Sequence, residues 1–488
     1  MRLQQSIIKY LWLILICSPS LTMADTTFAI SNAPNSLHPI LASDASSERI
    51  NALIYQPIIQ LDENDRPISG LADIKQHDAQ HYSLTLSSTK HRFSNNADVS
   101  LLDIAASLNL ARNHPRSPQA QTLSNISSIE TTKHSILISL KKPDHRFAEK
   151  LHISVAPKEM LLKDEALAQH PVGSGAFEWV KTQGDGGVIL RHRRSSKEIR
   201  FVVNKDPTMR VLKLLKGEAS ILQNDLPHEM YRLLKEDPNI QVAQTPGTTF
   251  SYLGFNMADP ILKQNEIRQA IAYAINRQDI VKHLFQGNAK LANTLLAPGH
   301  WAAHPDLPAY EYSPDKAKHL LATLGFSKDN PLELSYKTST DPFRLRIAAV
   351  FQQQLREVGI HLKIQSYEWG SFFGDIKAGR FQLYSLSWVG IRSPDVFRYV
   401  YHSDSLPPSG ANRGRYVSAE VDQLIEQAEE LPLEKSLPLY RKIQEKIHRD
   451  LVYVPLWHED QIVASRRGDL KPNKHGSYQY LEQAFGQH

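Results

Sequence analysis

Residues 346–365 read RIAAVFQQQLREVGIHLKIQ and combine a helix pattern with a strand pattern on either side of one glycine. Four apolar residues recur at the spacing of one helical face: Ile347, Phe351, Leu355 and Val358. After Gly359 the period changes to alternation, as in a half-buried strand: Ile360, Leu362 and Ile364. A helix that ends at a glycine and leads at once into a strand is typical of an α/β layer. The stretch therefore predicts an α/β fold.

Helix and strand patterns continue on both sides of this stretch. Towards the N-terminus, a helix at 101–111 between alternating strands at 82–87 and 135–140 predicts a small α+β unit that ends near residue 171. Towards the C-terminus, helical stripes with clear start and stop residues predominate. No repeat at the periods of solenoid proteins is present, so the chain is predicted to form ordinary globular domains.

The first 24 residues have the parts of a secretory signal peptide. Two basic residues precede a short apolar run, LWLILIC, and the small side chains of Thr22 and Ala24 suit cleavage after residue 24. The run is shorter than the ~20 residues that span a bilayer, which disfavours a membrane anchor. Cys17 leaves a lipoprotein signal as the alternative, although Ile16 stands where that signal needs a small residue. We expect export to the periplasm.

Cys17 is the only cysteine among the 488 residues, and it would be removed with the signal peptide. A mature chain without a thiol has no disulfide, no thiolate metal site and no cysteine nucleophile. The chain is longer than the ~250–300 residues at which a single core stops growing, so two or three domains are expected. Because no second long apolar segment follows, we expect the mature protein to be soluble.

The charge of the chain argues against nucleic acid as a partner. The formal net charge is +5, and Arg2 and Lys9 of the predicted signal peptide contribute two of these charges. The remaining basic residues are spread out, apart from short clusters such as 191–194. A nucleic-acid-binding protein would concentrate basic and aromatic residues on one face. We read the charge as ordinary solvated surface.

The motifs of common enzymes are absent from the sequence. There is no Gly-x-x-x-x-Gly-Lys-Ser/Thr loop, no Gly-x-Ser-x-Gly elbow and no His-Glu-x-x-His helix. The segment at His228 comes nearest to the last of these, but Arg232 replaces the second histidine. Histidine pairs at 77/81 and 300/304 have a spacing that suits two ligands on a helix, yet prolines near His300 favour a loop. We expect no catalytic residue, cofactor or metal, with a secreted hydrolase as the alternative class.

The segment from 381 to 416 has the composition of a ligand-binding region. An apolar strand at 383–388 ends in a loop, and α/β folds place ligand groups at such strand ends. The indole of Trp388 suits a pocket wall as well as a core, Arg392 can grip a carboxylate, and Asp395 can bind an amine or cap the next helix. A second loop at 412–416 lies on the same face or forms a surface turn. The candidate ligand-binding residues are Trp388, Val389, Gly390, Ile391, Arg392, Asp395, Asn412, Arg413 and Tyr416.

Several short motifs together give the chain a family resemblance. In chain order they are PVGSGAF at 171–177, YLGFN at 252–256, IRQAIAYAINRQDI at 267–280, YSPDKAKHLL at 312–321, GIHL at 359–362, the Trp388 segment and VPL at 454–456. Each motif alone is weak, but their order and spacing are specific. Over nearly the whole mature length the chain resembles the bacterial extracellular solute-binding proteins of family 5, the dipeptide and oligopeptide receptors of ABC importers.

The resemblance implies both an architecture and a function. The fold would be a two-lobed periplasmic-binding-protein fold of the class II type, with an extra α+β domain and a ligand cleft that closes about a hinge. A monomeric receptor would capture a solute, expected to be a peptide, and deliver it to ABC permease subunits in the inner membrane. The implied units are lobe I (25–44, 166–250 and 461–488), the extra domain of lobe I (45–165) and lobe II (251–460).

One position departs from the family pattern. Peptide receptors of this family usually carry an Asp three residues after the Trp, where it holds the α-ammonium group of the ligand, and here that residue is Ile391. Isoleucine cannot neutralise an ammonium group, and burying an unpaired one is costly. Either Asp395 or another carboxylate replaces it, or the ligand has no free amine. We predict that Arg392 reads an anionic group, and a nickel chelate, haem or an opine-like anion remain alternative ligands.

Overall fold

The structure, a computed structural model, describes residues 26–161, 164–408 and 410–486. The predictions of a signal peptide at 1–24 and of a lipoprotein site at Cys17 lie outside these residues. In the part of the chain that the structure describes, no helix has both the length and the apolar character that a bilayer crossing requires.

Lobe II contains the α/β layer that residues 346–365 predict. The helix α10 (Pro342–Glu357) ends before Gly359, and β15 (Ile360–Tyr367) follows and pairs in parallel with β14 (Leu332–Ser339). Gly359 has φ of +94°, and a Cβ atom there would lie 2.8 Å from the backbone of Ser327. Only glycine fits a positive φ with so close a neighbour. The predicted change from helix to strand at this glycine is confirmed.

The sheet of lobe II continues through β16 (Leu383–Trp388) to the long strand β12 (Gln241–Phe255). Alternate residues of β12 enter two different cores, Tyr252 on one face and Leu253 on the other, as the pleat of a strand requires. The other elements of lobe II are α7 (Asn265–Ala274), α8 (Arg277–His283), β13 (Ala289–Leu291), α9 (Pro314–Thr323), α11 (Trp369–Ala378), α12 (Val396–Tyr401), α13 (Ala419–Glu430) and α14 (Leu433–Asp450).

Lobe I extends the same sheet beyond the crossing strands. Its central strand β1 (Thr26–Ile30) lies between β10 (Glu198–Val203) and β11 (Ile221–Gln223) and is parallel to both. The helix α1 (Ala45–Ile54) packs into the core of this lobe, beside Phe28, rather than into that of the extra domain. The other elements are β8 (Phe177–Thr182), β9 (Val188–His192), α5 (Pro207–Leu215), α6 (His228–Glu236) and α15 (Tyr480–Gly486).

The extra domain has an antiparallel sheet and a core of its own. The strand order is β4-β5-β7-β6, and α2 (Leu101–Asn113) covers the sheet. The predicted α+β unit is thus present between α1 and β8. Its strands and helices are β2 (Ile59–Leu61), β3 (Pro67–Ser69), β4 (Ala72–Gln76), β5 (His81–Leu86), β6 (Ile126–Thr131), β7 (Ile136–Leu140), the 3-10 helix η1 (Phe147–Leu151), α3 (Lys158–Leu161) and α4 (Asp164–Gln169).

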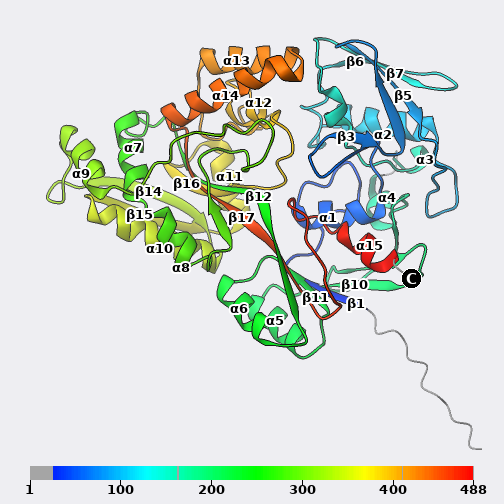
Figure 1. Cartoon of the computed structure of the whole chain (residues 1–488), viewed down its shortest axis with the longest axis horizontal. Coiled ribbons are helices and arrows are strands. Elements are labelled where there is room, and N and C mark those ends of the chain that lie inside the picture. The colour runs from blue at the N-terminus through cyan, green and yellow to red at the C-terminus, as the bar shows by residue number, and fades with distance from the viewer. Residues whose placement is uncertain (1–25, 162–163, 409, 487–488) are drawn as a thin grey trace, which may run out of the picture.

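Two long antiparallel strands, β12 and β17 (Tyr453–Ser465), connect the lobes (Figure 1). Their register is interrupted between Thr245 and Thr249. A Cβ atom on Gly247, inside this interruption, would lie 2.1 Å from the carbonyl oxygen of Glu459, so the strands approach as closely as glycine permits. An irregular segment between two regular ladders is a suitable hinge. The predicted lobe boundaries at 250/251 and 460/461 lie near it and stay a prediction.

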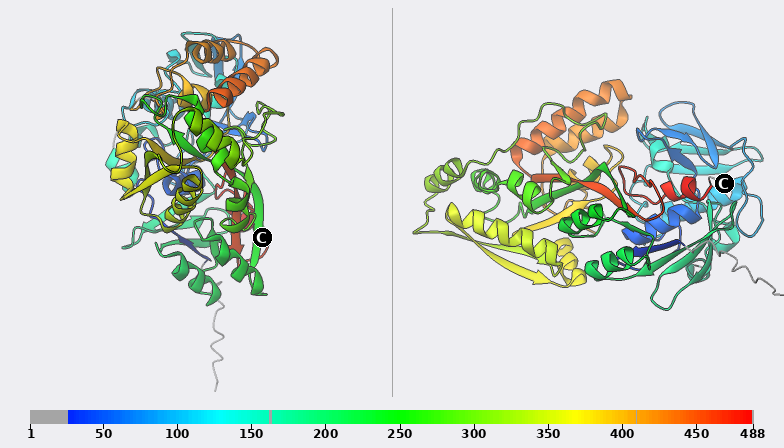
Figure 2. Two further views of the ribbon diagram at one scale, coloured as in Figure 1. Left: turned by 90° about the vertical axis from the view of Figure 1, so that its left-hand side faces the viewer. Right: turned by 60° about the horizontal axis from the view of Figure 1, so that its bottom comes forward.

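The lobes also meet far from the crossing strands. Both figures of the whole chain show the extra domain, in blue and cyan, beside α13 and α14, in orange, at the end of the molecule away from β11 and α5 (Figures 1 and 2). The described residues form the two-lobed α/β fold with an extra domain that the sequence predicts.

Candidate functional site

The loop at residues 389–395, called the ligand loop below, connects β16 to α12 and faces lobe I. Val389 is 51% exposed, and Gly390 takes a φ of +69°, which turns the chain. Further along the loop, the side chains of Ser393 and Asp395 contact residues of the extra domain. The loop is therefore the part of the predicted site that reaches across to the other lobe.

Trp388 is half-buried at the start of this loop, with its ring partly enclosed by protein. The guanidinium of Arg413 lies 4.4 Å from the ring centroid, and Tyr399 meets the ring nearly edge-on at 6.0 Å. The Nε1–H group is buried and has no acceptor among the described residues. An indole with one stacked cation and an unused donor suits a pocket wall better than an apolar core.

The side chain of Ile391 packs into the interior of lobe II. It is 7% exposed and belongs to a lobe II core that also contains Phe397 and Tyr401. At the position where peptide receptors of this family carry a carboxylate, this protein has part of its hydrophobic core.

Asp395 does not cap α12, and the predicted capping role is wrong. It occupies the N-cap position in helical backbone conformation without a capping hydrogen bond. Instead its carboxylate accepts a hydrogen bond from Arg146 of the extra domain, and Lys150 lies 3.4 Å away. Burial by itself would raise the pKa of Asp395, but Lys150 and Arg146 outweigh it and lower the pKa. Two cations of lobe I thus compete with a ligand amine for this carboxylate.

These contacts belong to a larger group, called the interlobe cluster below: Asp144, Arg146, Glu149, Lys150, Ser393 and Asp395. Lys150 joins the carboxylate of Asp395 to that of Asp144, whose oxygen is 2.7 Å from the ammonium group. Ser393 donates a hydrogen bond of 2.9 Å to Glu149. Four of the six residues come from the extra domain and two from the ligand loop, so the cluster connects the lobes directly.

Arg392 is the one charged residue of the ligand loop whose side chain is unpaired. Its carbonyl oxygen accepts a hydrogen bond of 3.1 Å from Nε2 of His300, but its guanidinium makes no hydrogen bond or ion pair with any described residue. Burial lowers its pKa, while Asp65 and Glu48 of lobe I act in the opposite direction. A desolvated guanidinium without a partner is available to an anionic group.

Two carboxyl groups of lobe I, those of Asp65 and Glu48, are near enough to Arg392 to act on its pKa, and only one of them lacks an ion pair. Asp65 is 4% exposed and bound by Lys474 and His475, each at 2.7 Å. Glu48, in the first turn of α1, is exposed; its amide donates to the carbonyl of Asp44, but its carboxylate forms no hydrogen bond or ion pair with any described residue. Desolvation nevertheless raises its pKa, with a smaller contribution from Asp44. Arg49 and, to a smaller extent, Arg392 act in the opposite direction.

The second predicted loop contributes one residue to this site. Asn412 is buried and bonds within its own loop, donating to the carbonyl of Tyr416 at 2.7 Å and accepting from its amide at 2.9 Å. The hydroxyl of Tyr416 donates to Asp450 at 2.5 Å. Arg413, in contrast, lies between Trp388 and Phe373, 5.3 Å from the second ring. The structure therefore brings Arg413 to Trp388, whereas the side chains of Asn412 and Tyr416 form hydrogen bonds within lobe II.

Sequence reasoning missed the lobe I side of the site, namely Glu48 and residues 144–150. The segment DHRFAEK at 144–150 has five titratable side chains among seven residues, which was a visible signal. Such a segment usually forms a solvated face, and nothing local to it indicates a partner in the ligand loop.

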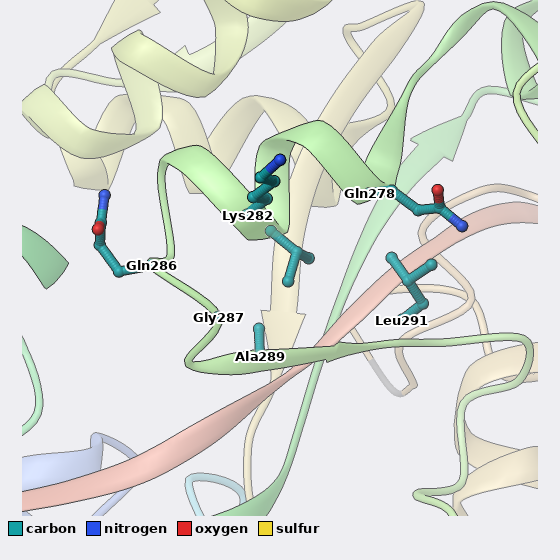
Figure 3. Close-up of a pocket in the computed structure, with 7 residues that line it drawn as sticks. Gln278, Lys282, Gln286, Gly287, Ala289 and Leu291 are labelled. Atoms are coloured by element: carbon teal, nitrogen blue, oxygen red, sulfur yellow. The ribbon is translucent and has the colours of Figure 1, made fainter.

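Two other features lie apart from the ligand loop. No three His, Cys, Asp or Glu residues of the described chain are grouped so that they could hold a metal ion. A recess of about 450 Å³ lies on lobe II between α8 and β13, and Figure 3 shows Gln278 and Lys282 above Ala289 and Leu291. None of its lining residues belongs to the ligand loop.

Comparisons with known proteins agree with this architecture. The dipeptide-binding protein of Escherichia coli (strain K12) is 28% identical over 296 residues, which cover 58% of this chain and 55% of that protein. The periplasmic binding protein DppA of Helicobacter pylori, solved with the peptide STSA, has a TM-score of 0.80 and 25% identity and covers 93% of this chain and 97% of its own. NikZ of Campylobacter jejuni, solved with Ni(L-His), has a TM-score of 0.82 at 22% identity, over 94% and 98% of the two chains, and is similar in fold.

A family model provides the assignment. The model for bacterial extracellular solute-binding proteins, family 5 (middle region), matches residues 67–409. This range includes most of the extra domain, the first crossing strand and the ligand loop. The family consists of solute-binding proteins rather than enzymes, and its members are extracellular or periplasmic. The chain belongs to family 5 of the bacterial extracellular solute-binding proteins.

Proposed function

We propose that this protein is exported to the periplasm and captures a peptide or peptide-like solute for an ABC importer, without catalysing a reaction. The similarity to dipeptide-binding proteins supports a peptide, and the two crossing strands support capture by closure of the lobes. The observation that carries the proposal is the unpaired guanidinium of Arg392 in the ligand loop, on whose pKa two carboxyl groups of lobe I act. ABC permease subunits would receive the solute, and the receptor would act as a monomer.

The charges at the site favour a ligand with both an anionic and a cationic group. Arg392 of lobe II and Glu48 of lobe I are oppositely charged, lie within electrostatic range of each other and form no ion pair. A zwitterion between them would give a carboxylate to the guanidinium and an ammonium group to the carboxylate. Glu48, on the opposite lobe, would thus supply the carboxylate that is missing at position 391. Trp388 and Arg413 would form the adjoining wall.

The experiment has two stages. The first is mass spectrometry of the solute that co-purifies with protein from the periplasm. Peptides or other zwitterions support the proposal, whereas a nickel chelate or haem contradicts it. Turnover of a peptide or ester library would contradict the non-enzymatic part.

The second stage measures binding of one identified peptide in three forms: free, N-acetylated and C-amidated. With the wild-type protein, each blocked form should bind at least about tenfold more weakly, because a charged group loses its partner. Arg392→Gln should bind the free and amidated forms equally, and Glu48→Gln should bind the free and acetylated forms equally. Arg380→Gln and Glu218→Gln, at exposed residues of the two lobes, are the matched controls. Equal selectivity in all variants would exclude Arg392 and Glu48 from the site.

A further inference from the structure

We propose that Lys474 and His475 are positioning residues: they occupy the buried carboxylate of Asp65 and so leave the guanidinium of Arg392 available to an anionic group of the ligand. Both belong to residues 473–477 near the C-terminus, called the tail turn below. The inference rests on the proposed function, because Arg392 is the residue that is proposed to read the ligand.

Asp65 is held in place by the turn between β2 and β3 of the extra domain. Its φ of +61° lies in the left-handed region, which Asp and Asn enter more readily than most residues. The amide of Asp65 donates to the carbonyl of Asp62 at 3.0 Å, and the side chain of Asp62 accepts from the amides of Asn64 and Arg66. The side chain of Asp65 is 2% exposed, and a carboxylate so deeply buried requires partners.

The tail turn gives a partner to each oxygen of this carboxylate. Nζ of Lys474 lies 2.7 Å from Oδ2 of Asp65, and Nε2 of His475 lies 2.7 Å from Oδ1. The ammonium group balances the negative charge, and the imidazole N–H adds a hydrogen bond. A second cation would therefore gain little by approaching Asp65.

Thr248 of the crossing strand β12 keeps the tail turn at this place. Its amide donates to the carbonyl of Lys474 at 3.0 Å, and its hydroxyl lies 3.1 Å from Nδ1 of His475. Because Nε2 of His475 carries the proton that Asp65 accepts, Nδ1 of the neutral ring accepts from the Thr248 hydroxyl. Within the turn, the amide of His475 donates to the side chain of Asn473 at 3.1 Å. The two side chains are thus fixed against Asp65 from the hinge side.

Hydrogen bonds connect this group to the ligand loop. Ser393, next to Arg392, bonds to Glu149 of η1, and Nδ1 of His152, directly after η1, lies 3.1 Å from the carbonyl oxygen of Ile59. Ile59 begins β2, the strand that leads to the turn of Asp65. The electrostatics agree with this placement.

Asp65 is the larger of the two carboxylate influences that raise the pKa of Arg392 against burial, and Arg392 helps to lower the pKa of His475. The histidines around Arg392 add no positive charge at neutral pH. Burial is the largest cause that lowers the pKa of His152 to about 4 and those of His300 and His475 below 6.5. Asp65 and Lys474 cancel each other.

Arg392 consequently keeps a positive charge that, of these neighbours, only Glu48 opposes. If residue 474 were neutral, Asp65 would balance Arg392 instead. The two residues belong to different lobes, so this competition would act in the closed, ligand-bound form, where an anionic ligand group would meet a guanidinium that is already paired. Lys474 therefore determines whether the site selects an anion.

The test measures selectivity for a carboxylate with a defined probe. The probe is an equimolar library of dipeptides and tripeptides, each supplied as the free acid and as the C-terminal amide. The protein is stripped of solute by unfolding and refolding, and mass spectrometry of the retained peptides gives the acid-to-amide ratio. The wild-type protein should retain the acids in at least about tenfold excess. Lys474→Gln should reduce the ratio to about one.

Companion variants separate this role from a purely structural one. Lys474→Gln combined with Asp65→Asn removes both charges of the pair and should restore the wild-type ratio, as should Lys474→Arg, which keeps the charge. Asp65→Asn alone leaves Lys474 near Arg392 and should select acids at least as strongly as the wild type. Lys471→Gln, at a lysine that is 78% exposed and three residues before Lys474, is the matched control and should change nothing.

A wild-type ratio in Lys474→Gln would overturn the inference, and so would a double variant no more selective than Lys474→Gln, because the loss would then come from a disturbed tail turn. If Lys474→Gln does not fold, Asp65→Asn decides, and a ratio below that of the wild type overturns the inference. A wild-type protein without preference for acids contradicts the proposed function and this inference together. A preference that Lys474→Gln keeps contradicts this inference alone.

Discussion

Glu149 should make the stability of the protein depend on pH between about 4.5 and 7. Its side chain is 15% exposed, and desolvation is the largest cause that raises its pKa from 4.5 to about 7. Asp395 raises the pKa further, whereas Arg146, Ser393 and Lys150 oppose the rise. The folded state thus holds a proton that the unfolded chain releases at a lower pH. The stability that this proton provides is present below pH 4.5 and is lost as the pH rises through 7.

The size of the effect follows from the shift. The pKa of Glu149 rises from 4.5 to about 7 on folding. At about 1.4 kcal/mol per pH unit, the wild-type protein therefore loses about 3 kcal/mol of stability as the pH rises through this range. Glu149→Gln keeps an oxygen for Ser393 and cannot ionise, so it should be more stable than the wild type at pH 8 by about this amount. For 488 residues at ~2.1 cal/mol/K each, the entropy of unfolding is about 1 kcal/mol/K, which gives about 3 °C in melting temperature.

The assay is thermal unfolding, followed by circular dichroism, of the wild type and Glu149→Gln at pH 5 and pH 8. The difference between the two proteins should be small at pH 5 and should reach about 3 °C at pH 8. Glu229→Gln, on α6, should differ from the wild type in melting temperature by the same amount at both pH values, because the hydrogen bonds of Glu229 lower its pKa below 4.5 and the carboxylate is ionised in both buffers. If the melting temperatures of Glu149→Gln and the wild type differ by the same amount at both pH values, the proposed role of the Glu149 proton is refuted.

Two further predictions concern single residues that the fold requires. Gly173→Ala would place a methyl carbon 2.0 Å from the carbonyl oxygen of Ile54, so the melting temperature should fall by several degrees, whereas Gly184→Ala, with no atom within 4 Å, should not change it. Arg277 is 4% exposed and donates to the carbonyls of Ala292, Pro455 and Tyr310. Arg277→Leu should therefore lower the free energy of unfolding, measured in urea, by about 3 kcal/mol or more. A loss below about 1 kcal/mol would contradict this prediction.

The parts of the fold that the sequence predicts are those in which local pattern and packing agree. The helix before Gly359 and the strand after it follow from a periodicity that spans fewer than twenty residues, and both faces are buried as predicted. The division into lobes came from motifs whose order matched a family. Packing alone places α1 with lobe I, because its apolar residues meet Phe28 and not the sheet of the extra domain.

The site was harder to predict because its contacts join distant parts of the chain. Asp395 precedes a helix, and an Asp before a helix is usually a cap, so the local pattern indicated a cap. Its partner Arg146 lies 249 residues earlier in the sequence. No local signal in either segment connects them, and only the folded arrangement of the lobes does. For the same reason, Arg413 could be placed in a loop but not against the ring of Trp388.

The ligand loop has no carboxylate at residue 391 and has one at residue 395. This placement of charge links the choice of ligand to closure of the lobes. Ile391 contributes to the core of lobe II, and Asp395 is paired with Arg146 and Lys150 of the extra domain, so the ligand loop keeps only the positive charge of Arg392. A complementary negative charge for a ligand amine then has to come from lobe I, where Glu48 is unpaired. On this arrangement a zwitterion binds one lobe through each of its charges, so only the closed form satisfies both. A ligand stabilises a conformation only through its difference in affinity for the two states. A zwitterion would therefore favour closure far more than a solute with either charge alone.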